Sequence, residues 1–115
     1  MDINNVDFAD EIVSRFSYDS AGKEILLTFQ SFMYKGKEVT KSHTLAISSW
    51  SQGQSRSCGS NTFDDLERHL GVPSLLLDFS VQDDFCSLVI NTVDDRYIEL
   101  KFYKVQIEFG ESNIS

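Results

Sequence analysis

The 115-residue sequence has a single proline, only two cysteines and no long apolar run. Its apolar stretches fall far short of the roughly 20 residues that a membrane-spanning helix requires. Residues 1–14 carry four acidic side chains and lack the apolar segment of a signal peptide. We therefore expect a cytoplasmic protein that has no membrane partner.

Cysteine and histidine are too scarce for the usual catalytic and metal-binding motifs. Cys58 and Cys86 stand 28 positions apart with no CxxC pair, and His43 and His69 form no HxH or HExxH motif. A catalytic pair of Cys58 with His69 is chemically conceivable, because a thiolate needs a neighbouring base, but its spacing fits no known signature. We predict no catalytic residue, no metal and no cofactor, and hence no enzyme.

Positive charge is also scarce, and the net charge is -8. Residues 15–62 hold six basic against three acidic side chains, whereas residues 63–115 hold four against eleven. Nucleic acid is not an expected partner, because phosphate binding needs a dense basic cluster. The acidity would attract a basic protein, although solubility alone also explains it.

The sequence does contain abundant apolar alternation, with 41% hydrophobic residues, which predicts one domain over residues 1–115 built from strands with one buried face. The first meander is expected at 11–18, 24–33 and 40–50. In its first strand, Ile12, Phe16 and Tyr18 share a face. Gly36 lies in the turn YKGKE, where it can adopt a positive φ.

A second meander is expected at 75–82, 85–92 and 96–109. In its middle strand Cys86 alternates with Leu88 and Ile90 on the buried face, whereas Cys58 is expected to be exposed. The apolar set of the last strand changes phase, from Ile98, Leu100 and Phe102 to Val105, Ile107 and Phe109. We therefore predict a bulge or sharp bend near Tyr103 and Lys104.

One helix of about eight residues is expected between the meanders, in the segment NTFDDLERHLGVP. Asn61 or Thr62 would cap it, and Gly71 with Pro73 would end it. The fold class is thus α+β, mainly β, with about six antiparallel strands in two meanders and one short helix between them. A curled sheet, a sandwich and an open barrel all remain compatible with this pattern.

Residues 48–61, SSWSQGQSRSCGSN, lack aliphatic side chains and are predicted to form a flexible loop that orders against a partner. Trp50 in this segment either covers the rim of the core or, if exposed, anchors an interface. Residues 110–115 are expected to be a frayed tail.

Two acidic clusters are predicted to form one negative, partner-binding surface together with Trp50. They are Asp64, Asp65 and Glu67 on the helix, and Asp94 and Asp95 in the last tight turn. That turn lies where the helix leads into the fourth strand. A further pair, Asp83 and Asp84, lies in the preceding turn, at the opposite end of the sheet.

The succession of YDSAGKEILLTFQSFMYKGKEVTKSHTLAISSW, an acidic segment, LLLDFSVQDD and RYIELKFYKVQIEF resembles the small acidic immunity proteins of bacterial polymorphic or contact-dependent toxin systems. The similarity covers most of the chain and lies in size, strand rhythm and acidity. The resemblance implies a cytoplasmic protein that binds one cognate toxin and occludes its active site, with no catalytic residue of its own.

We therefore expect a protein-binding module whose acidic surface imitates nucleic-acid phosphates towards a basic partner, such as a nuclease toxin. Two other classes stay open. Nine phenylalanines allow an apolar cavity, and with it a small-ligand-binding domain or an enzyme. An unprotected sheet edge would allow a homodimer.

Overall fold

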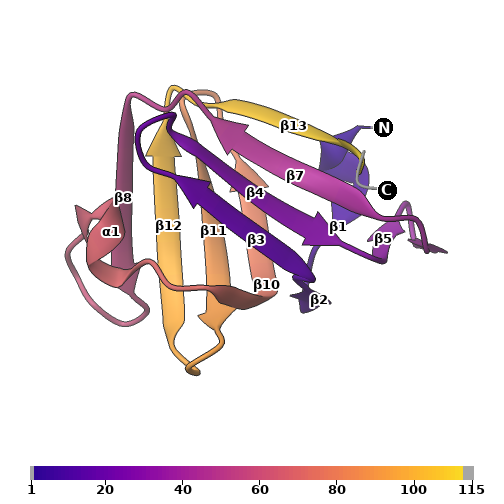
Figure 1. Cartoon of the computed structure of the whole chain (residues 1–115), viewed down its shortest axis with the longest axis horizontal. Helices are drawn as coiled ribbons and strands as arrows, with labels where there is room; N and C mark the ends of the chain where they lie inside the picture. The colour runs from indigo at the N-terminus through magenta and orange to yellow at the C-terminus, as the bar shows by residue number, and fades with distance from the viewer. Residues whose placement is uncertain (1, 113–115) are drawn as a thin grey trace.

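The computed structural model describes residues 2–112. Two antiparallel sheets face each other and enclose the main core, and a small third sheet lies beside them (Figure 1). The predicted class, α+β and mainly β, is confirmed, and the two sheets do not close into a barrel. No helix in the described part of the chain is both long and apolar enough to span a bilayer.

The four-stranded sheet contains the first predicted meander. Its strands, in spatial order, are β13 (Gln106–Glu111), β7 (His43–Ser48), β4 (Glu24–Phe29) and β3 (Arg15–Asp19). The alternate side chains Ile25, Leu27, Leu45 and Ile47 point into the core and are almost fully buried. Apolar and polar residues thus alternate along these strands because one face of the sheet is removed from water, as the sequence indicates.

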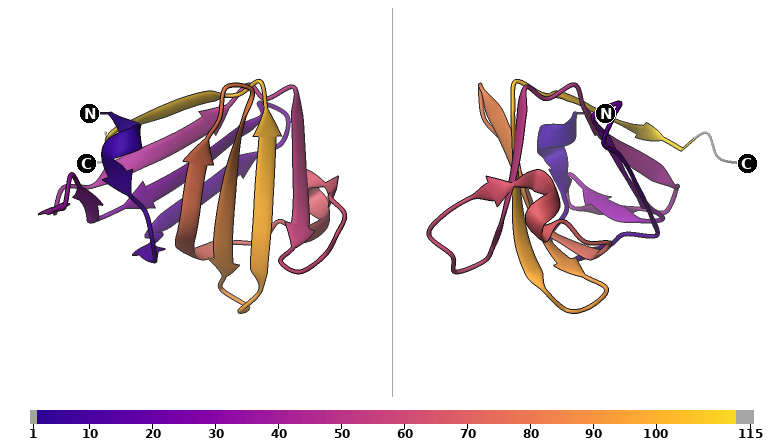
Figure 2. Two further views of the ribbon diagram at one scale, coloured as in Figure 1. Left: turned by 180° about the vertical axis from the view of Figure 1, so that it is seen from behind. Right: turned by 60° about the vertical axis from the view of Figure 1, so that its left-hand side comes forward.

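The six-stranded sheet contains the second predicted meander, β10–β11–β12. Its strands, in spatial order, are β2 (Glu11–Ile12), β10 (Pro73–Val81), β11 (Phe85–Thr92), β12 (Tyr97–Tyr103), β8 (Gln52–Ser57) and β9 (Asp64–Asp65). Cys86, Leu88 and Ile90 are buried as predicted, and Cys58 is exposed. The two sheets diverge away from the edge at which the chain crosses between them (Figure 2).

The third sheet interrupts the predicted strand 24–33. It consists of β1 (Val6–Asp7), β5 (Phe32–Tyr34) and β6 (Lys37–Val39), and the 3₁₀ helix η1 (Ile3–Asn5) precedes β1. Lys35 and Gly36 form the turn between β5 and β6 with φ values of 50° and 77°. A two-residue hairpin turn of this kind requires positive φ at both positions, which confirms the prediction for Gly36.

The predicted bend near Tyr103 and Lys104 is confirmed. Lys104 has a φ of 53° and separates β12 from β13. The chain leaves the six-stranded sheet there and enters the four-stranded sheet, so one continuous stretch serves both layers of the core. The apolar positions of the sequence change phase here because the chain passes from one sheet to the other.

The prediction of a flexible loop at 48–61 is wrong for its central part. Residues 52–57 form β8, which pairs along its length with β12, from Gln52 opposite Tyr103 to Ser57 opposite Ile98. Together with the division of the last strand, β8 raises the number of long strands from the predicted six to eight.

Small side chains at the inward positions explain why the sequence pattern does not predict β8. A Cβ atom at Gly53 would lie 3.2 Å from Leu66 Cδ2 and 3.2 Å from Trp50 Nε1. Ser55, also on the inward face, is fully buried. Bulky neighbours cover β8 so closely that its own inward positions must be small, and apolar alternation is therefore lost.

The helix is shorter than predicted and begins later. α1 spans Leu66–His69, and Asp65 precedes it without donating or accepting a side-chain capping bond. Asn61 and Thr62 therefore do not cap it. The preceding residues pair as β9 with β8 instead, and so short a helix depends on packing because propensity alone would not hold it.

Two further expectations at the ends of elements are wrong. Ile12 lies in β2 and is 69% exposed, because the predicted first strand divides before β3. Gly110 and Glu111 belong to β13, and the Ser112 amide donates to the Ser42 carbonyl oxygen at 2.9 Å, so this part of the predicted tail is ordered. Residues 113–115 of that prediction lie outside the described residues.

Candidate functional site

A cleft of about 920 Å³ lies between β3, at one edge of the four-stranded sheet, and the β9–α1 segment, at one edge of the six-stranded sheet. Four of the six predicted partner-binding residues line it. They are Trp50, Asp64, Asp65 and Glu67. The structure therefore brings together the helix cluster and the tryptophan, which the sequence places 14 or more positions apart.

A hydrogen bond joins the two sides of the cleft. The Tyr18 hydroxyl on β3 donates to Glu67 Oε1 on α1 at 2.9 Å. Partial burial, together with the Glu67 carboxylate, raises the pKa of Tyr18 to about 12. The phenol thus keeps its proton at neutral pH and orients Glu67 without neutralising its charge.

Trp50 forms part of the wall of the cleft rather than a projecting anchor. It is only 6% exposed, and its ring packs against Phe102 with 4.7 Å between centroids. Its carbonyl oxygen accepts a hydrogen bond from Lys23 Nζ at 3.4 Å. Coverage of the core rim is therefore confirmed, and the exposed alternative is wrong.

Ser55 fixes the position of α1 against β8. Its buried hydroxyl donates to the Asp65 carbonyl oxygen at 2.9 Å and accepts from the His69 amide at 3.2 Å. Leu66, 7% exposed, packs into the core between these two bonds. A single serine thus holds both ends of the short helix, and with them the acidic side of the cleft.

The charges at the cleft are unevenly compensated. Asp64 Oδ2 lies 2.7 Å from His69 Nε2, so a protonated His69 would offset that carboxylate. Asp65 is exposed, and Glu67 contacts the neutral Tyr18 phenol. Lys23 and Arg68 also line the cleft. Three negative side chains thus face two positive ones, and the negative side chains share the β9–α1 side of the cleft with Arg68.

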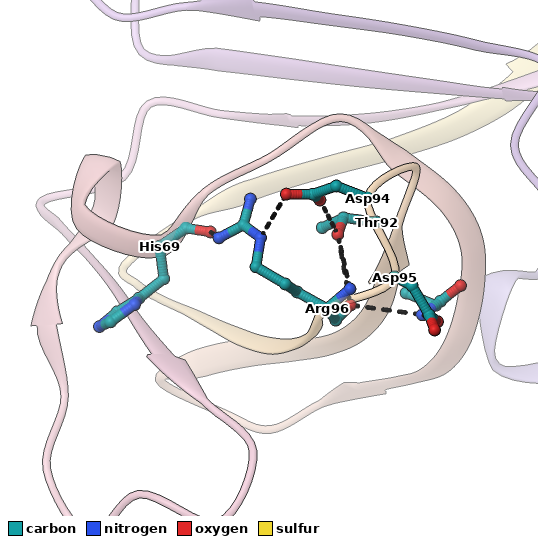
Figure 3. Close-up of polar contacts among 6 residues, drawn as sticks. His69, Thr92, Asp94, Asp95 and Arg96 are labelled. Carbon is teal, nitrogen blue, oxygen red and sulfur yellow. Dashed lines mark hydrogen bonds and ion pairs between the residues drawn. The ribbon is translucent and has the colours of Figure 1, made fainter.

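The last tight turn does not join this acidic group as predicted. Arg96 Nε donates to Asp94 Oδ2 at 2.8 Å, and Arg96 Nη1 donates to the His69 carbonyl oxygen at 3.2 Å (Figure 3). Asp95 accepts from the Asn91 side-chain amide at 3.1 Å. The turn does lie beside α1, but a guanidinium stands between the two clusters.

Asp94 is therefore part of an ion pair rather than a source of net negative charge. Hydrogen bonds from Thr92 and Arg96 lower the pKa of Asp94. Neither Asp94 nor Asp95 lines the cleft. The single surface expected from the sequence is wrong in this respect, and the acidic site reduces to Asp64, Asp65 and Glu67.

Other chemistry finds little support in the arrangement of side chains. Within residues 2–112, no three histidine, cysteine, aspartate or glutamate side chains are grouped as metal ligands. Partial burial and the neighbouring Glu99 raise the pKa of Cys58, which disfavours the thiolate that a nucleophile needs. His69, its conceivable base, is paired with Asp64.

The sequence reasoning misses the other seven residues that line the cleft, among them Tyr18, Lys23 and Arg68. Tyr18 and Glu67 are 49 positions apart in the sequence, and a local sequence pattern does not predict a contact between them. A scan against protein-family models, a search of the curated proteins and a search of the solved structures each found no match.

Proposed function

We propose that this chain is a cytoplasmic protein-binding module whose cleft receives a basic segment of a partner protein. The observation that carries the proposal is the convergence of Asp64, Asp65 and Glu67 on one side of a cleft of about 920 Å³. Three acidic against two basic side chains line this cleft, and a concave site with an excess of negative charge favours encounter with a positively charged surface.

The contact between Tyr18 and Glu67 supports a binding role for that carboxylate. A phenol donor at 2.9 Å restrains the side chain but leaves its charge in place. By contrast, Arg96 compensates Asp94. Glu67 takes part in no ion pair within the described residues, so an incoming lysine or arginine would find this carboxylate already oriented, and less of its binding energy would be lost in ordering the site.

We propose further that the partner is a toxin whose active site the bound chain occludes. A nuclease toxin presents positive charge to phosphates, and the carboxylates of the cleft can take the place of those phosphates. The net charge of -8 and the resemblance to small acidic immunity proteins point in the same direction.

The rival class, a small-ligand-binding domain or an enzyme with an apolar cavity, is less well supported. The inward side chains of both sheets pack into one buried cluster, in which Phe29, Phe102 and Leu45 have no exposed surface. The cleft itself has mostly polar and charged lining side chains. A core filled in this way leaves the phenylalanines explained by packing.

The proposal is tested by capture followed by a growth assay. The tagged wild-type chain and the variant Asp64→Asn/Asp65→Asn/Glu67→Gln are used to capture proteins from the native organism. Each captured protein is then expressed in cells with and without the chain. We expect one protein that arrests growth, that wild type neutralises, and that the triple variant fails to retain.

A matched control removes three charges elsewhere, in Asp83→Asn/Asp84→Asn/Glu108→Gln, all at exposed positions. Circular dichroism and thermal unfolding establish that both triple variants remain folded. The proposal is overturned if no captured protein is toxic, or if the cleft variant protects cells as fully as the control does.

A further inference from the structure

Strand β3 leaves one edge of the four-stranded sheet open. It is the end strand of that sheet, and among residues 2–112 its only paired neighbour there is β4. Arg15, Ser17 and Asp19 are exposed, whereas Phe16 and Tyr18 pack towards the core. An edge of this kind presents backbone amides and carbonyls that another strand can pair with.

The sequence of β3 is complementary to itself. In an antiparallel pair of β3 strands centred on Ser17, Arg15 of each copy stands opposite Asp19 of the other. Phe16 likewise stands opposite Tyr18. Opposite charges and aromatic pairs at directly facing positions stabilise antiparallel sheets, and both occur twice in this arrangement.

The two charged side chains are available for such pairing. Within residues 2–112, Arg15 takes part in no ion pair, and the Asp19 carboxylate accepts only the Gly22 amide at 2.9 Å. The serine on the symmetry axis is small enough to face its own copy. The charges that discourage pairing of β3 with an arbitrary strand are therefore matched by a second copy of β3 in this one register.

The opposite edge of the same sheet has no such complementarity. β13 reads QIEFGE, and an antiparallel pair centred on Glu108 would place two carboxylates opposite each other. A pair centred one residue later would place Ile107 opposite Glu111. Neither of these registers gives β13 the charge complementarity that β3 has with itself.

From these observations we infer that two copies of the chain associate through antiparallel pairing of β3 about a two-fold axis at Ser17, which extends the sheet from four strands to eight. The interface is isologous, as in most homodimers, so each favourable contact is made twice. This inference concerns the chain by itself and does not depend on the identity of the partner proposed for the cleft, although β3 also forms one side of that cleft.

A charge-swap series tests the register. The dimer dissociation constant is measured by sedimentation equilibrium for wild type, Arg15→Asp, Asp19→Arg and the double swap. Each single reversal places like charges opposite each other twice, and we expect the dissociation constant to rise roughly tenfold. The double swap restores both pairs and is expected to restore dimerisation. Glu108→Lys, on the other edge, is the matched control and should leave the constant unchanged.

Cross-linking gives a second measurement that tolerates weak association. In a Cys58→Ser background, Ser17→Cys places two thiols opposite each other on the axis, at a separation compatible with a disulfide. Ser20→Cys is the control, because the same register would hold its two copies about 20 Å apart. Mild oxidation should yield covalent dimer with the first variant and not with the second.

The inference is overturned if wild type sediments as a monomer and Ser17→Cys fails to cross-link. It is equally overturned if both cysteine variants cross-link alike, or if the double swap associates no better than the single reversals. A folded circular dichroism spectrum for every variant ensures that each of these outcomes reports on association.

Discussion

The Tyr18 hydroxyl and the Glu67 carboxylate, 49 positions apart in the sequence, meet at 2.9 Å across the cleft. The bond links the edge of one sheet to the helix attached to the other. It therefore has two consequences, one for the stability of the fold and one for the orientation of a negative charge at the proposed binding site.

Tyr18→Phe removes this bond and should lower the free energy of unfolding by about 0.5–1.5 kcal/mol at neutral pH. The pKa of the phenol is raised from 10 to about 12, so its contribution is full below pH 10 and is lost as the pH rises through about 12. Chemical denaturation at several pH values measures the difference. Tyr97→Phe, at an exposed position, is the control and should be neutral at every pH.

Ser55→Ala should destabilise the chain by about 1–3 kcal/mol, because the Asp65 carbonyl and the His69 amide lose a buried partner. We also expect weaker partner binding, since α1 carries Glu67. Denaturation and a binding titration measure the two effects. Ser57→Ala changes an exposed serine of the same strand, and an equal loss in that variant would contradict the role given to Ser55.

Asp94 is expected to contribute to the stability of the folded chain in a pH-dependent way. Thr92 and Arg96 lower the pKa of Asp94 below its ordinary 3.8, so its contribution is present above pH 3.8 and is lost as the pH falls through the lowered value. Asp94→Asn should therefore unfold at a lower temperature than wild type at pH 7, and the two melting temperatures should converge in acid. A constant gap between them, or one that widens in acid, would argue against the pairing.

Gly71 and Arg96 should behave as a coupled pair. A Cβ atom at position 71 would lie 2.5 Å from Arg96 Nη2, so Gly71→Ala must displace the guanidinium that reaches the His69 carbonyl. We expect Gly71→Ala to be clearly destabilising in wild type and much less so in an Arg96→Ala background, where only the contact of the new Cβ with Thr92 Cγ2 at 3.2 Å remains. Unfolding free energies of the four proteins form the cycle, and additivity would exclude the contact.

The elements predicted correctly from sequence are the strands whose buried positions carry large apolar side chains. Apolar alternation predicts β4, β7, β11 and the core positions of β12, because these strands face a thick hydrophobic layer. It fails at β8, where Gly53 and Ser55 are small on account of the helix packed above them. The local sequence pattern indicates which side chains are buried, but it does not indicate which distant element packs over them.

The candidate site is only half predictable for the same reason. Asp64, Asp65 and Glu67 lie within four positions of the sequence and are predicted from it, whereas Tyr18 enters the cleft through tertiary packing. The role of Arg96 was also missed. It follows Asp94 closely in the sequence, but the decisive contact is with the His69 carbonyl on another element.

The central claim is that the carboxylates of the cleft attract and hold a basic partner. The most direct measurement is the association rate constant for the captured toxin, over a range of salt concentrations, for wild type and for Asp64→Asn/Asp65→Asn/Glu67→Gln. We predict a fast wild-type rate that falls steeply with salt, a slower variant rate with a shallower dependence, and convergence of the two at high salt. Equal rates with the same salt dependence would contradict the account.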